Sequence, residues 1–157
     1  MPDAAKSVRF AYLPPMSGLA ANEARLGSGA INVRIGEGRT AEVLRNLCYQ
    51  LWESSNGEFL WQQFCDRIEE LFGCQINEPV LSAVRDEITM NYKTSEGITL
   101  DISASGRGQQ QIMLLLSYMV ANPGSVLLLD EPDAHLEILR QRQPKHCLLY
   151  TSPSPRD

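Results

Sequence analysis

The sequence lacks an apolar run long enough to cross a membrane, and residues 1–10 lack the apolar core of a signal peptide. Its longest apolar stretch, residues 112–120, is about half as long as the roughly twenty residues that a membrane-spanning helix needs. Basic residues are outnumbered by acidic ones, with 14 Lys and Arg and 19 Asp and Glu. We therefore expect a cytoplasmic location, no membrane partner, and no electrostatic drive for this chain itself to bind nucleic acid.

Cysteine and histidine are few and scattered. The four cysteines, at positions 48, 65, 74 and 147, form no CxxC pair and have no metal-ligand spacing, so we expect reduced thiols of a cytosolic protein. Hydrophobic residues, by contrast, make up 43% of the 157 residues. That content is enough to fill the core of one domain, or of one lobe of a larger domain.

The last eleven residues, 147–157, continue none of the patterns that precede them. Codon by codon, they match the translation of a transposase-type sequencing adapter at every residue. We therefore expect residues 144–157 to form a tail that is not native, with the adapter translation starting at Cys147, and we read function from residues 1–143. A natural tail rich in proline and serine is the alternative.

Apolar periodicity predicts three helices. The first covers about residues 40–54 with Thr40 as its N-cap, and the second covers residues 59–72, where Gly73 stands in the position of a C-cap glycine. The third covers residues 109–120 and is stopped by an Asn-Pro-Gly sequence. Two of these helices follow one another, and the third comes later in the chain.

Alternating and apolar segments predict strands. A short strand is expected at residues 8–12, and residues 87–92 and 97–102 form a hairpin joined by a four-residue turn. Residues 125–129 are continuously apolar, which is typical of a central strand buried on both faces. Residues 16–38 hold too few apolar side chains to predict a long element. The predicted fold class is therefore α/β.

The sharpest chemical signal is an apolar strand that ends in two carboxylates, Asp130 and Glu131. Ligands bind at the carboxyl edge of the strands in open α/β sheets, and adjacent carboxylates there can divide the work of phosphoanhydride hydrolysis. Asp130 would hold Mg²⁺ through its water shell, and Glu131 would orient the attacking water and take its proton. Taken alone, these residues also fit a buried strand followed by an acidic turn.

A loop of small residues, Ser105-Gly-Arg-Gly-Gln109, precedes Asp130 by 25 residues, with one helix between them. Small residues at a helix N-terminus leave backbone N–H groups free, and the helix dipole adds positive potential, so the loop predicts a phosphate site. A Ser-Gly-x-Gly string alone is usually an ordinary turn. The order of glycine loop, helix, Pro-Gly turn, apolar strand and paired carboxylates is far more specific.

With this combination the chain resembles the ABC ATPase superfamily, with the glycine loop as the signature motif and Asp130-Glu131 as Walker B. Residues 130–137, Asp-Glu-Pro-Asp-Ala-His-Leu-Glu, are most similar to the chromosome-maintenance and RecF-like branch. Within it they resemble the AAA-type ATPases that neighbour the OLD (overcoming lysogenization defect) nucleases. The stretches 12–19 and 36–40 are similar to that group as well, so the resemblance covers about residues 8–143.

The resemblance implies a partial P-loop NTPase fold, the ABC-type ATPase head, over residues 1–143. A helical insert would lie at about 40–73, followed by the β-hairpin, and the signature and Walker B would lie at about 103–137. The parent protein would be an ATP hydrolase coupled to DNA maintenance or phage defence, with any DNA contact made through the parent.

The resemblance also implies cofactors and a partner. Heads of this family pair around two ATP molecules, so the cofactors are ATP and Mg²⁺ and the partner is a second head in a homodimer. Ser105, Gly106 and Gly108 would touch the ATP held by the other head. Asp133 and His135 would lie in a turn that communicates across the dimer.

The sequence departs from the family pattern at several points. The usual Leu-Ser-Gly-Gly-Gln signature here carries an inserted Arg107, and Ser103 competes with Ser105 for the phosphate contact. No stretch fits the Gly-x-x-x-x-Gly-Lys-Ser/Thr pattern of the P-loop, so the Walker A lobe is missing and we expect this chain alone to be inactive. The switch histidine that the family carries after the next strand is missing as well, because the sequence ends first. His135 is not that residue, since it stands only four positions past Glu131.

Two other classes of function remain open. One is the nucleotide-binding subunit of an ABC transporter, although such heads usually carry Thr-Ser-Ala-Leu-Asp after the Walker B proline, where this chain has Asp-Ala-His-Leu-Glu. The other is a noncatalytic interaction module, in which Asp130 and Glu131 are structural. A P-loop upstream in the gene would favour an ATPase over the interaction module.

Overall fold

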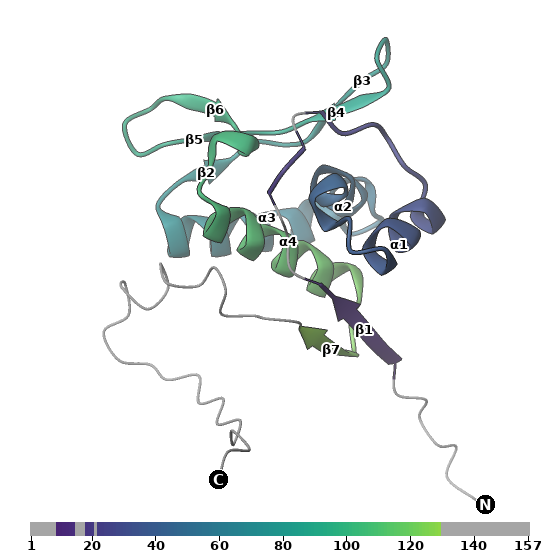
Figure 1. Ribbon diagram of the computed structural model, residues 1–157. Coiled ribbons are helices and arrows are strands. Elements are labelled where there is room, and N and C mark those ends of the chain that lie inside the picture. The colour runs from purple at the N-terminus through teal and green to yellow at the C-terminus, as the bar shows by residue number, and fades with distance from the viewer. Residues whose placement is uncertain (1–8, 15–17, 21, 130–157) are drawn as a thin grey trace, which may run out of the picture.

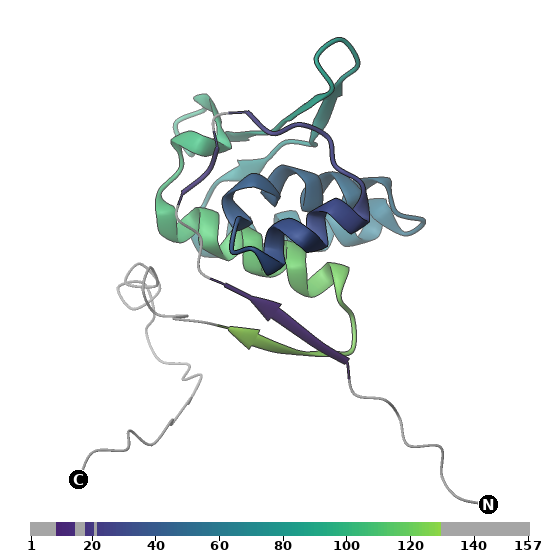
Figure 2. The same ribbon diagram turned by 45° about the vertical axis from the view of Figure 1, so that its right-hand side comes forward.

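The computed structural model describes residues 9–14, 18–20 and 22–129 and shows three layers (Figures 1 and 2). A two-stranded parallel sheet lies on one side, the helices lie in the middle, and short antiparallel strands lie on the other side. The fold is therefore mixed α/β, as the sequence pattern predicts.

All three predicted helices are present, and a fourth precedes them. Helix α3 ends where expected, at Gly73, which adopts the left-handed conformation with φ of 66°. The helices are α1 (Ser28–Gly36), α2 (Leu44–Glu53), α3 (Gly57–Phe72) and α4 (Arg107–Ala121), and two 3₁₀ turns, η1 (Thr40–Glu42) and η2 (Ile102–Ala104), precede α2 and α4.

The structure corrects two predictions in the residues before α2. Helix α1 lies within the stretch where no long element was expected, and it is anchored by Ile31 and Ile35, which are four positions apart and buried. The surrounding glycines dilute this short apolar signal. Thr40 is not the N-cap of α2 but begins η1, and the first N–H groups of α2 are bonded by the carboxylate of Glu23. That acceptor is too distant in the sequence for a local pattern to reveal.

Helices α2 and α3 are joined by a tight connection at Gly57. A side chain at Gly57 would collide with the carbonyl of Trp52 near the end of α2, so this close approach requires glycine. Trp61 packs edge-on against Trp52 and stacks on Phe64, whose ring centroid lies 5.2 Å away. Ile68 lies one turn further along α3 and is fully buried, which confirms the apolar stripe that predicts this helix.

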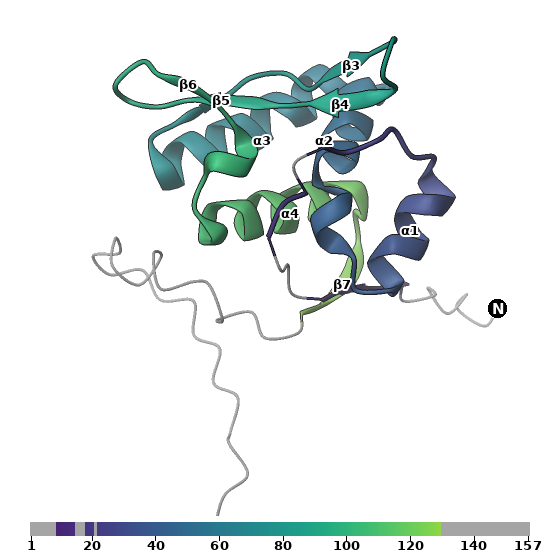
Figure 3. The ribbon, with the colours of Figure 1, turned by 45° about the horizontal axis from the view of Figure 1, so that its top comes forward.

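The described residues form three small sheets. Their strands are β1 (Arg9–Leu13) parallel to β7 (Ser125–Leu129), β5 (Asn91–Lys93) between β2 (Gln75–Ile76) and β6 (Thr99–Asp101), and β3 (Val80–Ser82) paired with β4 (Glu87–Thr89). The predicted hairpin is present as β5 and β6. Its first strand is interrupted at the buried Met90, because residues 87–89 pair with β3 instead. Figure 3 shows these strands lying across α2 and α3.

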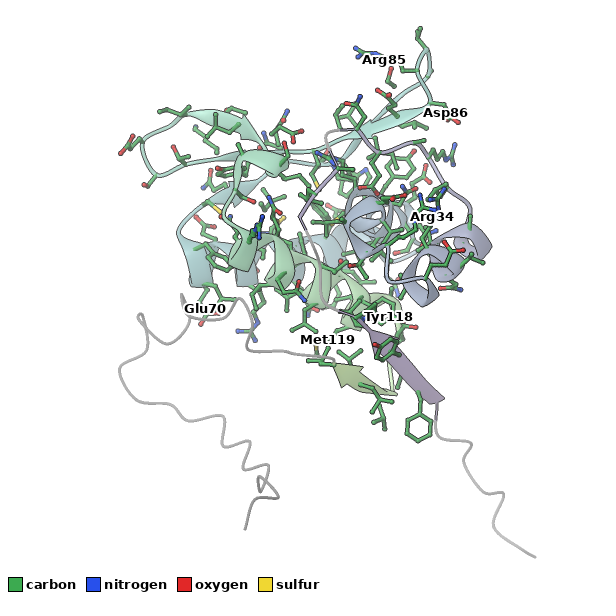
Figure 4. The ribbon with its side chains drawn as sticks, in the orientation of Figure 1. Arg34, Glu70, Arg85, Asp86, Tyr118 and Met119 are labelled. Atoms are coloured by element: carbon green, nitrogen blue, oxygen red, sulfur yellow. The ribbon has the colours of Figure 1, made fainter. Side chains whose placement is uncertain are left out.

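The core lies between the helices and reaches the inner face of the β1–β7 sheet. Leu13 of β1 is 1% exposed, and Met113 and Leu114 of α4 are fully buried beside it in one apolar cluster. Tyr118 and Met119 lie at the far end of α4, next to this sheet (Figure 4).

The outer face of the β1–β7 sheet is not covered by any described residue. Phe10 is 67% exposed, and Tyr12, Val126 and Leu128 are each nearly half exposed. The sequence predicts β7 correctly as a strand, but the prediction that both of its faces are buried is wrong for this face. Only α4 and its neighbours supply an apolar layer, and they lie on the inner side.

Candidate functional site

The structure describes one half of the predicted site. Ser105, Gly106 and Gly108 lie in the turn that leads into α4. Asp130, Glu131, Asp133 and His135 follow the end of β7 and lie outside the described residues. The structure thus describes residues 103–108, the loop predicted to be the signature motif and called the signature loop below, but only the strand that leads to the carboxylates.

The signature loop begins with the tight turn η2, which its own side chains hold closed. The Ser105 hydroxyl donates to the carbonyl of Ile102 at 2.7 Å, and the Ser105 N–H donates to the same oxygen at 3.1 Å. Gln110, on the first turn of α4, directs its Nε2 back at the carbonyls of Ile102, Ser103 and Ser105 at 3.3, 3.2 and 2.9 Å. The turn is therefore fixed to the helix that follows it.

The N-terminus of α4 is bare. Its N-cap is Gly106, its first N–H groups have no side-chain cap among the described residues, and no carboxylate lies in its first turn. The free N–H groups and the helix dipole give this end of α4 a positive potential, and the exposed Arg107 beside it adds a positive charge, so an anion can bind here. Gly106 is exposed with open space around it, while Gly108 is buried.

The two candidate serines differ in what their side chains do. Ser105 is 8% exposed and its hydroxyl is used inside the turn. Ser103 is exposed, and its backbone N–H donates to Asp101 at 2.8 Å. In this conformation, Ser103 rather than Ser105 presents a side chain to the outside of the loop.

Helix α4 and strand β7 run in opposite directions and bring their functional ends to one side. The chain reverses at Asn122, where α4 ends, and at Gly124, which has φ of 70°. Fifteen helical residues rise about 22 Å, and five strand residues span about 17 Å, so β7 runs most of the way back along α4. Figures 1 and 2 both show β7 pointing back toward the half of the molecule where α4 begins. Leu129, the last residue of β7, therefore lies on that side.

Sequence patterns did not single out two side chains that shape this site. Gln110 is 3% exposed, and its Oε1 is the only buried side-chain oxygen or nitrogen without a partner in the described part of the chain. Arg45, on the first turn of α2, is 1% exposed and reaches Asp101 at the start of η2. An arginine on an amphipathic helix is usually at the surface, so no local signal marks Arg45 as buried.

The described cysteines offer no nucleophile. Cys48, Cys65 and Cys74 are free thiols. Burial raises the pKa of all three, and that of Cys65 to about 12, so they are protonated at neutral pH. Within residues 9–14, 18–20 and 22–129 there is also no group of three His, Cys, Asp or Glu side chains that could hold a metal ion.

In the same part of the chain, no helix has the length and apolar character needed to span a bilayer. No protein-family model, no curated protein and no solved structure matches the chain. Function must therefore be inferred from the residues and geometry of this chain and from the motifs they carry.

Proposed function

We propose that this chain carries the signature loop and the Walker B strand of an ABC-type ATPase head, a P-loop NTPase fold, and that its parent protein hydrolyses ATP. The main support for the proposal is the order of these elements along the chain. Helix α4 begins without a side-chain cap and directly follows a turn of small residues. After α4 the chain reverses into the apolar parallel strand β7, and Asp130 and Glu131 come directly after that strand in the sequence. Free N–H groups at the start of a helix form a ready site for a phosphate.

The residues present fit ATP and Mg²⁺ in their chemistry. The N–H groups at the start of α4 and the Arg107 guanidinium would bind phosphate oxygens. Asp130 would hold the magnesium ion through water, and Glu131 would take the proton of the attacking water. The bound ion would neutralise charge on the phosphates. Asp133 and His135 would carry the contact onward to the second head.

Pairing of two heads is the arrangement that the family resemblance implies. The exposure of Gly106 and Arg107 supports this arrangement, because a phosphate held by a second head could reach the start of α4. We therefore propose a homodimer with ATP between the heads, and, following the resemblance, a parent protein coupled to DNA maintenance or phage defence. This chain alone should hydrolyse no ATP, because it has no P-loop lysine to cradle the β- and γ-phosphates.

Substituting the N-cap glycine tests the phosphate site, because it separates stability from activity. Gly106 has φ of −63° and no atom near its missing Cβ, so Gly106→Asp fits without strain. Aspartate is a strong N-cap, and we expect α4 to gain a few tenths of a kcal/mol. Its carboxylate would also occupy the N–H groups and repel phosphate. In the parent protein, ATP turnover should fall by roughly 100-fold or more, as when a donor to a reacting oxyanion is lost.

Gly27→Asp is the matched control. Gly27 is the N-cap of α1, also has no side-chain cap, and also has open space around it. The same substitution there should give a similar gain in stability and leave ATP turnover at the wild-type level. If Gly106→Asp and Gly27→Asp had equal turnover, the start of α4 would not bind phosphate and the proposal would fail.

Ser103 and Ser105 can be separated in the parent as well. Ser105→Ala removes the hydroxyl that donates to Ile102, so it should lower the stability of the chain by about 1 kcal/mol. Ser103→Ala should lower turnover, because this residue is exposed, and it should cost less stability than Ser105→Ala, because its side-chain hydrogen bond to Asp101 lies in a partly exposed place. The reverse pattern would assign the phosphate contact to Ser105.

A further inference from the structure

A charged network buried under the signature loop connects it to helix α2. The Arg45 side chain is 1% exposed and makes two hydrogen bonds at opposite ends of its guanidinium. One nitrogen, Nη1, donates to the carbonyl of Ala20 at 3.0 Å, and the other, Nη2, donates to Oδ1 of Asp101 at 2.8 Å. Two directed bonds from a planar group hold it in one orientation.

Glu23 fixes the other end of this network. Its carboxylate accepts the backbone N–H groups of Arg45 at 3.0 Å and Asn46 at 2.6 Å, so it caps α2 from a distant segment. It also accepts a hydrogen bond from Nδ2 of Asn46 at 2.8 Å. Oδ1 of Asn46 in turn accepts a hydrogen bond from the N–H of Leu26 at 2.7 Å. Burial raises the pKa of Glu23, against the lowering effect of these hydrogen bonds and of Arg45. The backbone of Arg45 is therefore tied to the segment before α1.

Asp101 transmits this constraint to the loop. The oxygen that receives Arg45 also accepts the N–H of Ser103, which makes Asp101 the N-cap of η2. Gln110 holds the same turn from the side of α4. The turn is thus clamped between two helices, by Arg45 from α2 and by Gln110 from α4.

We propose that Arg45, acting through Asp101, is a positioning residue that sets the orientation of the signature loop for contact with ATP on the second head. The inference rests on the proposed function of that loop. Stability alone explains the pair poorly, because the Asp101 side chain is 39% exposed and ion pairs that solvent reaches add little stability. What the pair adds is direction: it fixes where η2 lies relative to α2, and so where the exposed Ser103 and the start of α4 lie.

Asp101→Asn tests this role because it removes the charge and keeps the shape. The asparagine oxygen can still accept the N–H of Ser103, so the cap of η2 survives while the pull of Arg45 weakens. The Asp101 side chain is 39% exposed, so folding should tolerate the change. In the parent protein we expect kcat to fall roughly 10- to 100-fold, as expected for a small misplacement of a positioned group, with KM for ATP unchanged. Amide hydrogen exchange of residues 102–105 should become faster in the same variant.

Asp66→Asn is the matched control, since Asp66 lies exposed on α3 and bonds only its neighbour Gln62 in the described structure. It should change neither kcat nor the exchange of the loop. If Asp101→Asn kept the wild-type kcat while Gly106→Asp lost turnover, the positioning role would be refuted and the proposed function would stand. A fall in kcat no larger than the loss of folded protein, measured by circular dichroism, would also refute it. If the wild-type parent hydrolysed no ATP, both would fall.

Discussion

The helical body around α2 and α4 and the β1–β7 sheet differ in how their surfaces are covered. In the body even charged groups are buried with partners, as Arg45 is between Ala20 and Asp101. In the sheet, one face packs on α4 and the other leaves Phe10 two-thirds exposed. Parallel strands are usually covered on both faces. The body is therefore specified by contacts among the described residues, whereas the outer face of the sheet is not.

Breaking the buried network should give the largest loss of stability. Nη1 of Arg45 lies 3.8 Å from Oε2 of Glu23, and both side chains are 1% exposed. Arg45→Met leaves this carboxylate buried without its charge partner, so the free energy of unfolding should fall by about 3–5 kcal/mol. Arg25→Met is the control, since Arg25 lies 3.6 Å from Glu53 and both side chains are 48% exposed. It should cost less than about 1 kcal/mol. Urea unfolding followed by circular dichroism measures both, and equal losses would contradict the contrast between the body and the surface.

The two faces of β1 should respond differently to truncation. Leu13 is 1% exposed on the inner face, so Leu13→Ala should destabilise the chain by about 2–5 kcal/mol. Phe10 is 67% exposed on the outer face, and Phe10→Ala should cost less than about 1 kcal/mol. Thermal unfolding of the two variants compares them directly. A Phe10→Ala loss as large as that of Leu13→Ala would show that the outer face is covered after all.

The smallest effect concerns acid stability at the edge of the body. Burial by itself would raise the pKa of Asp101, but hydrogen bonds from Ser103 and the charge of Arg45 outweigh it and lower the pKa below its ordinary 3.8. The ionised carboxylate therefore stabilises the fold above that value, and the stabilisation is lost as pH falls through the lowered pKa. Asp101→Asn should flatten the acid limb of stability against pH by less than about 1 kcal/mol, because the side chain is partly exposed. An acid limb as steep as that of wild type would contradict this.

Local patterns were sufficient for much of the body. The stripe of α3 and its terminal glycine predict that helix, because amphipathic spacing and a left-handed C-cap both act within a few residues. The glycine loop likewise predicts where α4 begins, to within two residues. The hairpin of β5 and β6 follows from its turn.

The remaining features depend on long-range contacts that no local pattern reports. Glu23 caps α2 in place of Thr40 because the fold brings a distant segment to that helix terminus. Arg45 is buried for the same reason, since its partners Ala20 and Asp101 lie 25 and 56 residues away in the sequence. The exposure of β7 could not be read from its apolar sequence, because that sequence reports only which faces can be buried.

The central claim, that the end of β7 and the start of α4 serve an ATP site shared by two heads, is tested most directly in the parent protein. Glu131→Gln keeps the size of the side chain but cannot take the proton of the attacking water, so turnover should stop while ATP stays bound. Size-exclusion chromatography with ATP should then show this variant as a dimer, and adding Gly106→Asp to it should return a monomer. A Glu131→Gln variant that stays monomeric with ATP bound, or that still turns over normally, would contradict the assignment of this strand end as an ABC-type catalytic site.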